Sequence, residues 1–255
     1  MGLFASPAVV GIYYVAQQVA SLPQKLKTSF DPILGPVITR NLQTQNYVEI
    51  AKHVGQVGFW IIAAQAGIAL ALGIPGEAVM GLVGPQFVGG AMALAFLLAA
   101  EVVAAAAVVS ESALVYMARH RNLLISLGML MVQALVSVTL IILVDDLPMK
   151  SEHIGLYQAA AVACGLAISL GIGSLIKSRL LSHLLGQNIR VWRWTLLMAV
   201  AAAALLGFVI VGVPARFEWV ELTIGIPAIL GLYGWIIWRW GFSPEDRILF
   251  RKTRD

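Results

Sequence analysis

The chain has 255 residues, of which 60% are hydrophobic and only 12% are charged. Soluble globular domains carry about 25% charged residues, so a soluble chain this apolar would have too little polar material to cover its surface. The formal net charge of +4 could suggest a nucleic-acid-binding protein, but the basic residues flank apolar stretches and form no basic face. The composition indicates an integral membrane protein and argues against nucleic acid as a partner.

Seven apolar stretches follow one another along the chain. A helix needs about 20 apolar residues to cross the hydrocarbon of a bilayer, and most of the stretches reach or approach this length. They predict an all-α polytopic membrane helix bundle of about seven transmembrane helices over residues 1–241, followed by a charged cytoplasmic tail at 242–255. The stretches are 6–41, 55–72, 88–117, 123–144, 154–176, 194–213 and 222–240.

The first stretch is unusual, because residues 6–41 would be about 54 Å long as a single helix, too long for one straight span. It contains Pro7, Pro23, Pro32 and Pro36, and proline inside a helix removes a hydrogen bond and bends the helix. We expect one long, kinked and tilted helix beside a cavity. The alternative is a short span that ends near Leu22 and is followed by a cytoplasmic amphipathic helix.

The segments between the later stretches contain strong turn signals. Residues 73–90 (GIPGEAVMGLVGPQFVGG) are rich in Gly and Pro and predict an outside loop. Residues 119–121 (Arg-His-Arg) form a very short connection, which predicts that the third and fourth helices are antiparallel neighbours. The Ala-rich and Gly-rich runs at 104–107 and 165–173 predict close approach of helix backbones.

Lys and Arg residues are distributed unequally between the two sides of the predicted bundle. When the connecting segments are assigned alternately to two sides, one side holds 15 of these cations and the other holds only Lys150 and Arg216. Short loops rich in Lys and Arg remain cytoplasmic. The N-terminus is therefore expected outside and the C-terminus inside. The 15 cations are Lys25, Lys27, Arg40, Lys52, Arg119, Arg121, Lys177, Arg179, Arg190, Arg193, Arg239, Arg247, Arg251, Lys252 and Arg254.

Motifs for known catalytic chemistry are not found in the sequence. There is no Gly-rich phosphate-binding loop that ends in Lys-Ser or Lys-Thr, and no nucleophile elbow with a Ser-His-Asp set. The four histidines lie at loops or helix ends, and none pairs with another at metal-ligand spacing. We therefore expect a protein that is not an enzyme, with no catalytic residues, no metal and no cofactor.

A polar stripe lies on the otherwise apolar first stretch. At 100° per residue its members fall within about 100° of one another, although the bend at Pro23 blurs the later positions. A cation buried in a membrane indicates a functional site, whereas a lysine that ends a short span lies among lipid headgroups. Both interpretations of Lys25 remain open on spacing alone. The stripe residues, which we take as candidates for a substrate cavity, are Tyr14, Gln17, Gln18, Ser21, Lys25 and Thr28.

Two glutamates lie inside the third stretch. An acidic residue at mid-depth costs about 2.5–3.5 kcal/mol on insertion scales, so Glu101 should face protein or water. We expect Glu101 to couple protons or cations or to line the cavity; the alternative is a protonated carboxyl hydrogen-bonded to a neighbouring helix. Glu111 lies near the cytoplasmic end and can reach the interface. It is a second coupling or lining candidate, for which the structural interpretation is favoured.

The first half of the chain resembles a known family. Residues 11–18 (GIYYVAQQ), 20–23 (ASLP) and 32–40 (PILGPVITR) look like a characteristic helix of bacterial polysaccharide or O-antigen flippases, members of the multidrug/oligosaccharidyl-lipid/polysaccharide (MOP) exporter superfamily. Residues 83–90 (VGPQFVGG) resemble an outside loop of that family. The resemblance covers roughly residues 11–121, and beyond them it rests on helix count and hydropathy.

The resemblance implies a transporter with two helical bundles around a central cavity and alternating access. This chain looks like the second, C-terminal lobe of such a transporter, so it would pair with an N-terminal lobe or a second subunit. The cargo would be a lipid-linked oligosaccharide, a sugar on polyprenyl pyrophosphate, moved across the bacterial inner membrane for lipopolysaccharide or exopolysaccharide biosynthesis. Lys25 would attract the phosphate, and Gln17 and Gln18 would bond sugar hydroxyls. Membrane lipids and a polysaccharide polymerase are further expected partners.

Three other functions remain as alternatives. Ion-coupled multidrug efflux, in the same superfamily, would use Glu101. A non-transporting membrane scaffold would serve polysaccharide assembly beside a polymerase. A seven-helix receptor fits the helix count but not the sequence, because Tyr116-Met-Ala-Arg-His, and not Asp-Arg-Tyr, ends the third stretch, and the seventh contains no lysine for a retinal.

Overall fold

The computed structural model describes residues 6–28, 31–146, 151–189, 191–212 and 221–242, without the side chains of 26–28, 31–34 and 151–153. Every regular element within these ranges is a helix. The elements are α1 (Pro7–Ala20), α2 (Leu22–Thr28), α3 (Asp31–Gln43), α4 (Tyr47–Gly73), α5 (Gly76–Val83), η1 (Pro85–Gly90), α6 (Ala91–Met117), α7 (Arg119–Asp145), α8 (Ser151–Leu185), α9 (Trp194–Val211), η3 (Glu221–Gly225), α11 (Ile226–Ile236) and η4 (Ile237–Gly241).

Six helical segments in the described part of the chain are long and apolar enough to cross a membrane. This confirms the predicted all-α polytopic membrane helix bundle. The first apolar stretch is absent from the six because it is divided into α1, α2 and α3, of which the longest has 14 residues. The six segments are Tyr47–Gly73, Pro85–Met117, Arg119–Asp145, Ile154–Leu185, Trp194–Val211 and Glu221–Gly241.

The break in the first stretch lies where proline predicts it. Ser21 separates α1 from α2 with φ −74° and ψ −14°, and its hydroxyl donates to the Gln18 carbonyl at 2.7 Å. The Pro23 carbonyl accepts a hydrogen bond of 3.2 Å from the side-chain amide of Gln65 in α4. A neighbouring helix thus hydrogen-bonds backbone at the break, as a bend inside a membrane requires. The expected kink is present, and the backbone remains right-handed helical through Ser21, whose N–H still bonds to the Gln17 carbonyl.

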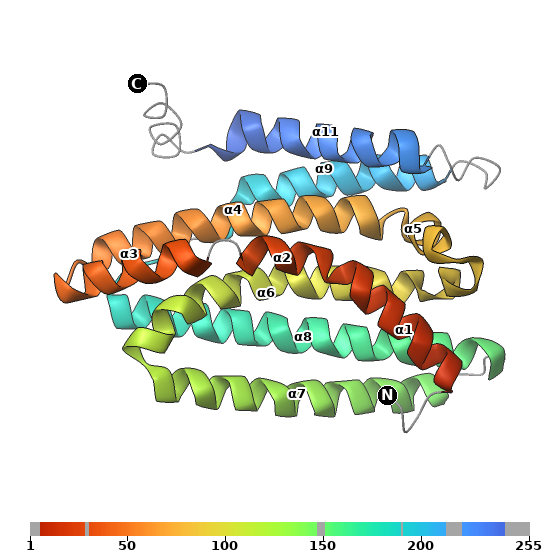
Figure 1. Ribbon diagram of the computed structural model, residues 1–255, viewed down its shortest axis with the longest axis horizontal. Coiled ribbons are helices and arrows are strands. Elements are labelled where there is room, and N and C mark those ends of the chain that lie inside the picture. Colours follow the sequence, from red (N-terminus) through yellow and green to blue (C-terminus); the bar gives the residue numbers. More distant parts are fainter. Residues whose placement is uncertain (1–5, 29–30, 147–150, 190, 213–220, 243–255) are drawn as a thin grey trace.

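The helices form a flattened assembly (Figure 1). The long helices lie in a row, in the order α11, α9, α4, α6, α8 and α7. The three short helices α1, α2 and α3 cross the face made by α4, α6 and α8. The prediction that the helices joined at Arg119–Arg121 are neighbours needs correction. Only Ala118 separates α6 from α7 in the chain, yet α8 lies between them in space and packs extensively against both.

The seam between α7 and α8 depends on small residues. A Cβ placed on Gly165 would collide with the hydroxyl of Ser137, and one on Gly173 would collide with the sulfur of Met129. Between them, the Ser169 hydroxyl donates to the Met129 carbonyl at 2.7 Å. These three residues recur every four positions on one face of α8, so the prediction of close backbone approach at 165–173 is confirmed.

A second correction concerns residues 73–90, which the sequence predicts to be a loop. The structure places two short helices there, α5 and η1. Pro85 occupies the first position of η1, where its missing N–H costs no helical hydrogen bond. The turn signals therefore mark the ends of short helices and not an irregular segment.

The α3–α4 and α6–α7 connections lie at one end of the bundle (Figure 1), which is called the basic end because of the arginines beside its connections. Arg40 is in the last turn of α3, Arg119 begins α7 and Arg193 precedes α9. Arg193 also joins helices, since it donates to the Gly241 carbonyl at 2.8 Å and lies 4.1 Å from the ring centre of Phe59. Lys150 and Arg216, the cations assigned to the opposite side, lie outside the described residues.

Candidate functional site

A polar cavity of about 320 Å³ lies between the α1–α2 bend, α6 and α8. Most of its wall area is polar, which is unusual for a space between apolar helices. Leu97 and Glu101 of α6 and Leu166 and Leu170 of α8 form its far wall. The side nearest the N-terminus is formed by Tyr14, Gln17, Gln18, Ala20, Ser21 and Gln24.

The spacing of the polar residues on α1 explains the shape of this wall. Tyr14, Gln17, Gln18 and Ser21 lie three, four and seven positions apart, so they fall on one face of the helix. Tyr14 is 59% exposed and both glutamines are exposed, so the cavity opens onto the surface of the chain. Exposed amides in hydrocarbon would lack hydrogen-bond partners. This face must therefore meet water or another protein.

Glu101 is joined directly to the bend. The side-chain amide of Gln24 donates to Glu101 Oε1 at 2.8 Å. Glu101 stands ten residues into α6, about 15 Å along the helix axis. An amide donates to a carboxylate without neutralising its charge. The cavity wall therefore presents a carboxylate, three side-chain amides, a hydroxyl and a phenol, which are groups that hydrogen-bond a polyhydroxylated ligand.

The stripe predicted from the sequence is divided at the bend. Tyr14, Gln17, Gln18 and Ser21 line the cavity, whereas Lys25 is exposed on α2 and is not among the lining residues. The side chain of Thr28, the last residue of α2, lies outside the described residues. Because the helix axis changes direction between Ser21 and Pro23, the angular position calculated for α1 does not continue into α2.

Glu111 lies in a different place from Glu101, inside a second polar cluster between α6, α7 and α8. Lys177 is buried, with 3% of the residue exposed. Its ammonium donates to Glu111 Oε2 at 3.0 Å and to the Ser126 hydroxyl at 3.0 Å. The Asn122 amide donates to Glu111 Oε1 at 3.3 Å. This cluster joins three helices by charge-assisted hydrogen bonds, and none of its residues lines the polar cavity.

Sequence reasoning missed two residues of these clusters. Gln24 is seven positions after Gln17, which is the signal that could have added it to the stripe. Lys177 was placed in a cytoplasmic connection because the fifth apolar stretch ends at residue 176. In the structure α8 continues without interruption to Leu185, so Lys177 is inside the helix. The absence of Gly or Pro between 177 and 185 could have shown this.

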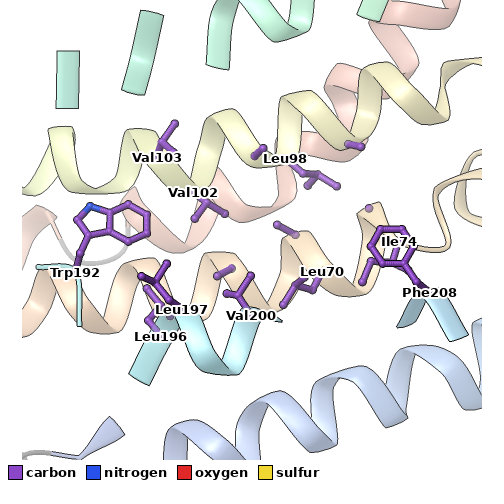
Figure 2. A pocket seen from close by; sticks show the side chains of 15 residues that line it. Leu70, Ile74, Leu98, Val102, Val103, Trp192, Leu196, Leu197, Val200 and Phe208 are labelled. Carbon is purple, nitrogen blue, oxygen red and sulfur yellow. The ribbon is translucent and has the colours of Figure 1, made fainter. Parts of the chain in front are cut away.

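An apolar cavity of about 430 Å³ lies on the other side of α6, between α6, α4 and α9 (Figure 2). Its labelled walls include Leu70 and Ile74 of α4, Leu98 and Val102 of α6, and Val200 of α9. Trp192 closes the end where α9 begins. These side chains offer no charge and almost no hydrogen-bonding group, so the space suits a hydrocarbon chain.

Among the residues that the structure describes, no group of three or more His, Cys, Asp or Glu side chains could hold a metal ion. No protein-family model, no curated protein and no solved structure matches this chain.

Proposed function

We propose that this chain is one lobe of a bacterial flippase that moves a lipid-linked oligosaccharide across the inner membrane. The observation that carries the proposal is the polar cavity lined by Gln17, Gln18, Gln24 and Glu101 within a bundle of apolar membrane-spanning helices. Amide and hydroxyl groups both donate and accept hydrogen bonds, which is what sugar hydroxyls require. The resemblance to polysaccharide flippases points the same way.

Two further features support a lipid-linked cargo. A sugar in the polar cavity would stay hydrated while its polyprenyl chain remains in hydrocarbon, and the apolar cavity beside Leu98 has room for part of such a chain. Lys25 is exposed one residue beyond the cavity-lining Gln24. In the proposal its ammonium attracts the pyrophosphate, for which lysine is a common point-charge partner.

The open cavity also supports a partner. Because Tyr14 and the neighbouring glutamines are exposed, a second bundle is needed to enclose a sugar against lipid. That bundle is an N-terminal lobe, or a second subunit. In the proposal, the basic end that carries Arg40, Arg119 and Arg193 faces the cytoplasm, which puts the N-terminus in the periplasm and the C-terminus inside.

The test is the surface polysaccharide of cells whose chromosomal copy of the gene carries substitutions. Gln17→Leu combined with Gln18→Leu should lower surface polysaccharide at least about tenfold, since two hydrogen bonds worth about 1 kcal/mol each are removed. Lipid-linked oligosaccharide should accumulate at the inner face. Lys25→Ala should lower export as well. Undiminished polysaccharide in these variants, at equal protein levels, would exclude the proposed cavity role.

Gln133→Leu is the matched control, because Gln133 lies in α7 and does not line the polar cavity. It should export as the wild type does. A transport-dead double variant that still restores polysaccharide to a deletion strain would instead support the non-transporting scaffold beside a polymerase.

Ion-coupled efflux of cationic drugs is the second candidate, favoured by the single carboxylate that the described cavity wall contains, that of Glu101. A cation would bind this oxygen in place of the Gln24 amide, 2.8 Å away. Glu101→Gln should then abolish drug resistance and leave surface polysaccharide unchanged. The opposite pattern, normal resistance with lost polysaccharide, would favour the flippase.

A further inference from the structure

A third cavity, of about 380 Å³, lies at the basic end of the bundle, where α6 turns into α7. The turn consists of Ala118, whose φ of −149° and ψ of 53° are not helical. The end of α8 closes the opposite side. The lining residues are Met117, Ala118, Arg119, His120, Arg121 and Leu184. This cavity shares no residue with the polar cavity or with the apolar cavity.

The charge of this cavity is not balanced by the part of the protein that the structure describes. Arg119, His120 and Arg121 are exposed, and none of the three has an ion-pair partner among the described residues. Glu111 of α6 accepts a hydrogen bond from Asn122 in the first turn of α7, but its carboxylate is already paired with Lys177 at 3.0 Å. Arg119 and Arg121 carry the same charge and line the same cavity, so an anion that enters it is attracted by both.

The surface next to the cavity is apolar. One turn further along α7, Leu123 is 56% exposed, Leu124 67% and Leu127 51%. Met117 and Leu184 are apolar members of the cavity wall itself. Because α7 is long and apolar enough to span a membrane, these leucines lie where acyl chains begin. Two arginines followed by exposed leucines along α7 are complementary to an amphiphile with a phosphate headgroup and acyl chains.

We infer that this cavity binds the phosphate of an anionic phospholipid, whose acyl chains lie along the exposed leucines of α7. Arg119 and Arg121 supply the charge-assisted hydrogen bonds, for which the guanidinium fork suits phosphate oxygens. Basic pockets between membrane helices on the cytoplasmic side bind such headgroups. The inference goes beyond the proposed flippase activity and does not depend on it, since it needs neither a sugar nor the polar cavity.

The test uses the full chain purified in neutral detergent and phosphatidylglycerol as the added lipid. A ligand that binds only the folded state raises the thermal unfolding midpoint by an amount that grows with its concentration relative to its dissociation constant. Phosphatidylglycerol should raise the midpoint, phosphatidylcholine should not, and soluble glycerol phosphate should not at the same concentration. Added salt should weaken the effect, because the arginines lie near the surface.

Arg119→Gln combined with Arg121→Gln should weaken the apparent affinity about 30-fold, since each cation near an anionic headgroup contributes about 1 kcal/mol. Arg40→Gln is the matched control, an exposed arginine at the same end that does not line the cavity, and it should bind as the wild type does. If the double glutamine variant does not fold, Arg119→Lys with Arg121→Lys keeps the charge and should retain binding.

Three results would overturn the assignment. Wild-type affinity in the double glutamine variant would remove the site. An equal loss in Arg40→Gln would mean diffuse attraction by the whole basic end. Stabilisation by glycerol phosphate at the same concentration would replace the lipid with a soluble anion.

Discussion

Glu101 and Glu111 lie on the same helix, ten residues or about 15 Å apart, and the structure surrounds them differently. Glu101 faces a cavity and accepts a hydrogen bond from the uncharged amide of Gln24. Glu111 is bonded to the buried ammonium of Lys177 and to Asn122. An acidic residue inside an apolar helix therefore has no fixed role. The carboxylate of Glu111 joins three helices through Lys177 and Asn122, whereas that of Glu101 lines the wall of a polar cavity.

The largest expected effect comes from removing the cation beside Glu111. Lys177→Met should destabilise the fold by about 3 kcal/mol, the lower end of the cost of breaking a buried ion pair, because the Glu111 side chain is 39% exposed. Thermal unfolding in detergent measures the change. Lys177→Met combined with Glu111→Gln should recover most of the loss. A single variant as stable as the wild type would mean that the pair does not stabilise the bundle.

A substitution that alters packing but no charge should affect the surroundings of Glu111 and leave those of Glu101 unchanged. Gly165→Leu inserts a side chain where a Cβ would already collide with Ser137, so it should push α7 from α8 and cost about 1–3 kcal/mol. It should also lengthen the Lys177–Ser126 contact and leave the Gln24–Glu101 bond intact. Crosslinking rates of cysteine pairs across α7–α8 and across α2–α6 measure this. Gly171→Leu is the control, since a Cβ there meets nothing within 4 Å.

The smallest effect on stability is expected at Glu101. Glu101→Gln keeps the shape and a hydrogen-bonding oxygen, so the unfolding free energy should change by less than about 1 kcal/mol. Transport and not stability should report this substitution. If Glu101→Gln destabilised the protein as strongly as Lys177→Met, both glutamates would be structural and the comparison would fail.

Much of the fold follows from hydropathy, because each membrane-spanning helix satisfies its own backbone and is recorded locally in the sequence. The order of the helices in space is not local, and so the insertion of α8 between α6 and α7 could not be predicted. The prediction of a loop at residues 73–90 was wrong for another reason. Their Gly and Pro residues limit helix length but do not prevent the short helices α5 and η1.

The candidate cavity was predicted in part. Helical spacing placed Tyr14, Gln17, Gln18 and Ser21 on one face, and the structure brings Glu101 to that face from a distant part of the chain. The prediction loses accuracy after the bend, where Lys25 departs from the stripe. It also placed Lys177 in a connection, because a hydropathy profile ends a span at a charge and contains no information about a partner on another helix.

The ion pair of Glu111 and Lys177 can form only after the second of its two residues has been synthesised. The two residues are 66 positions apart. Because translation adds about 5–20 residues per second, Glu111 is synthesised roughly 3–13 s before Lys177. During that interval the ribosome completes α7 and most of α8, and Glu111 has no cation from α8. A nascent chain that ends after α7 should therefore be degraded quickly. Glu111→Gln should lengthen its lifetime in a pulse-chase experiment, and an unchanged lifetime would show that insertion does not depend on this pair.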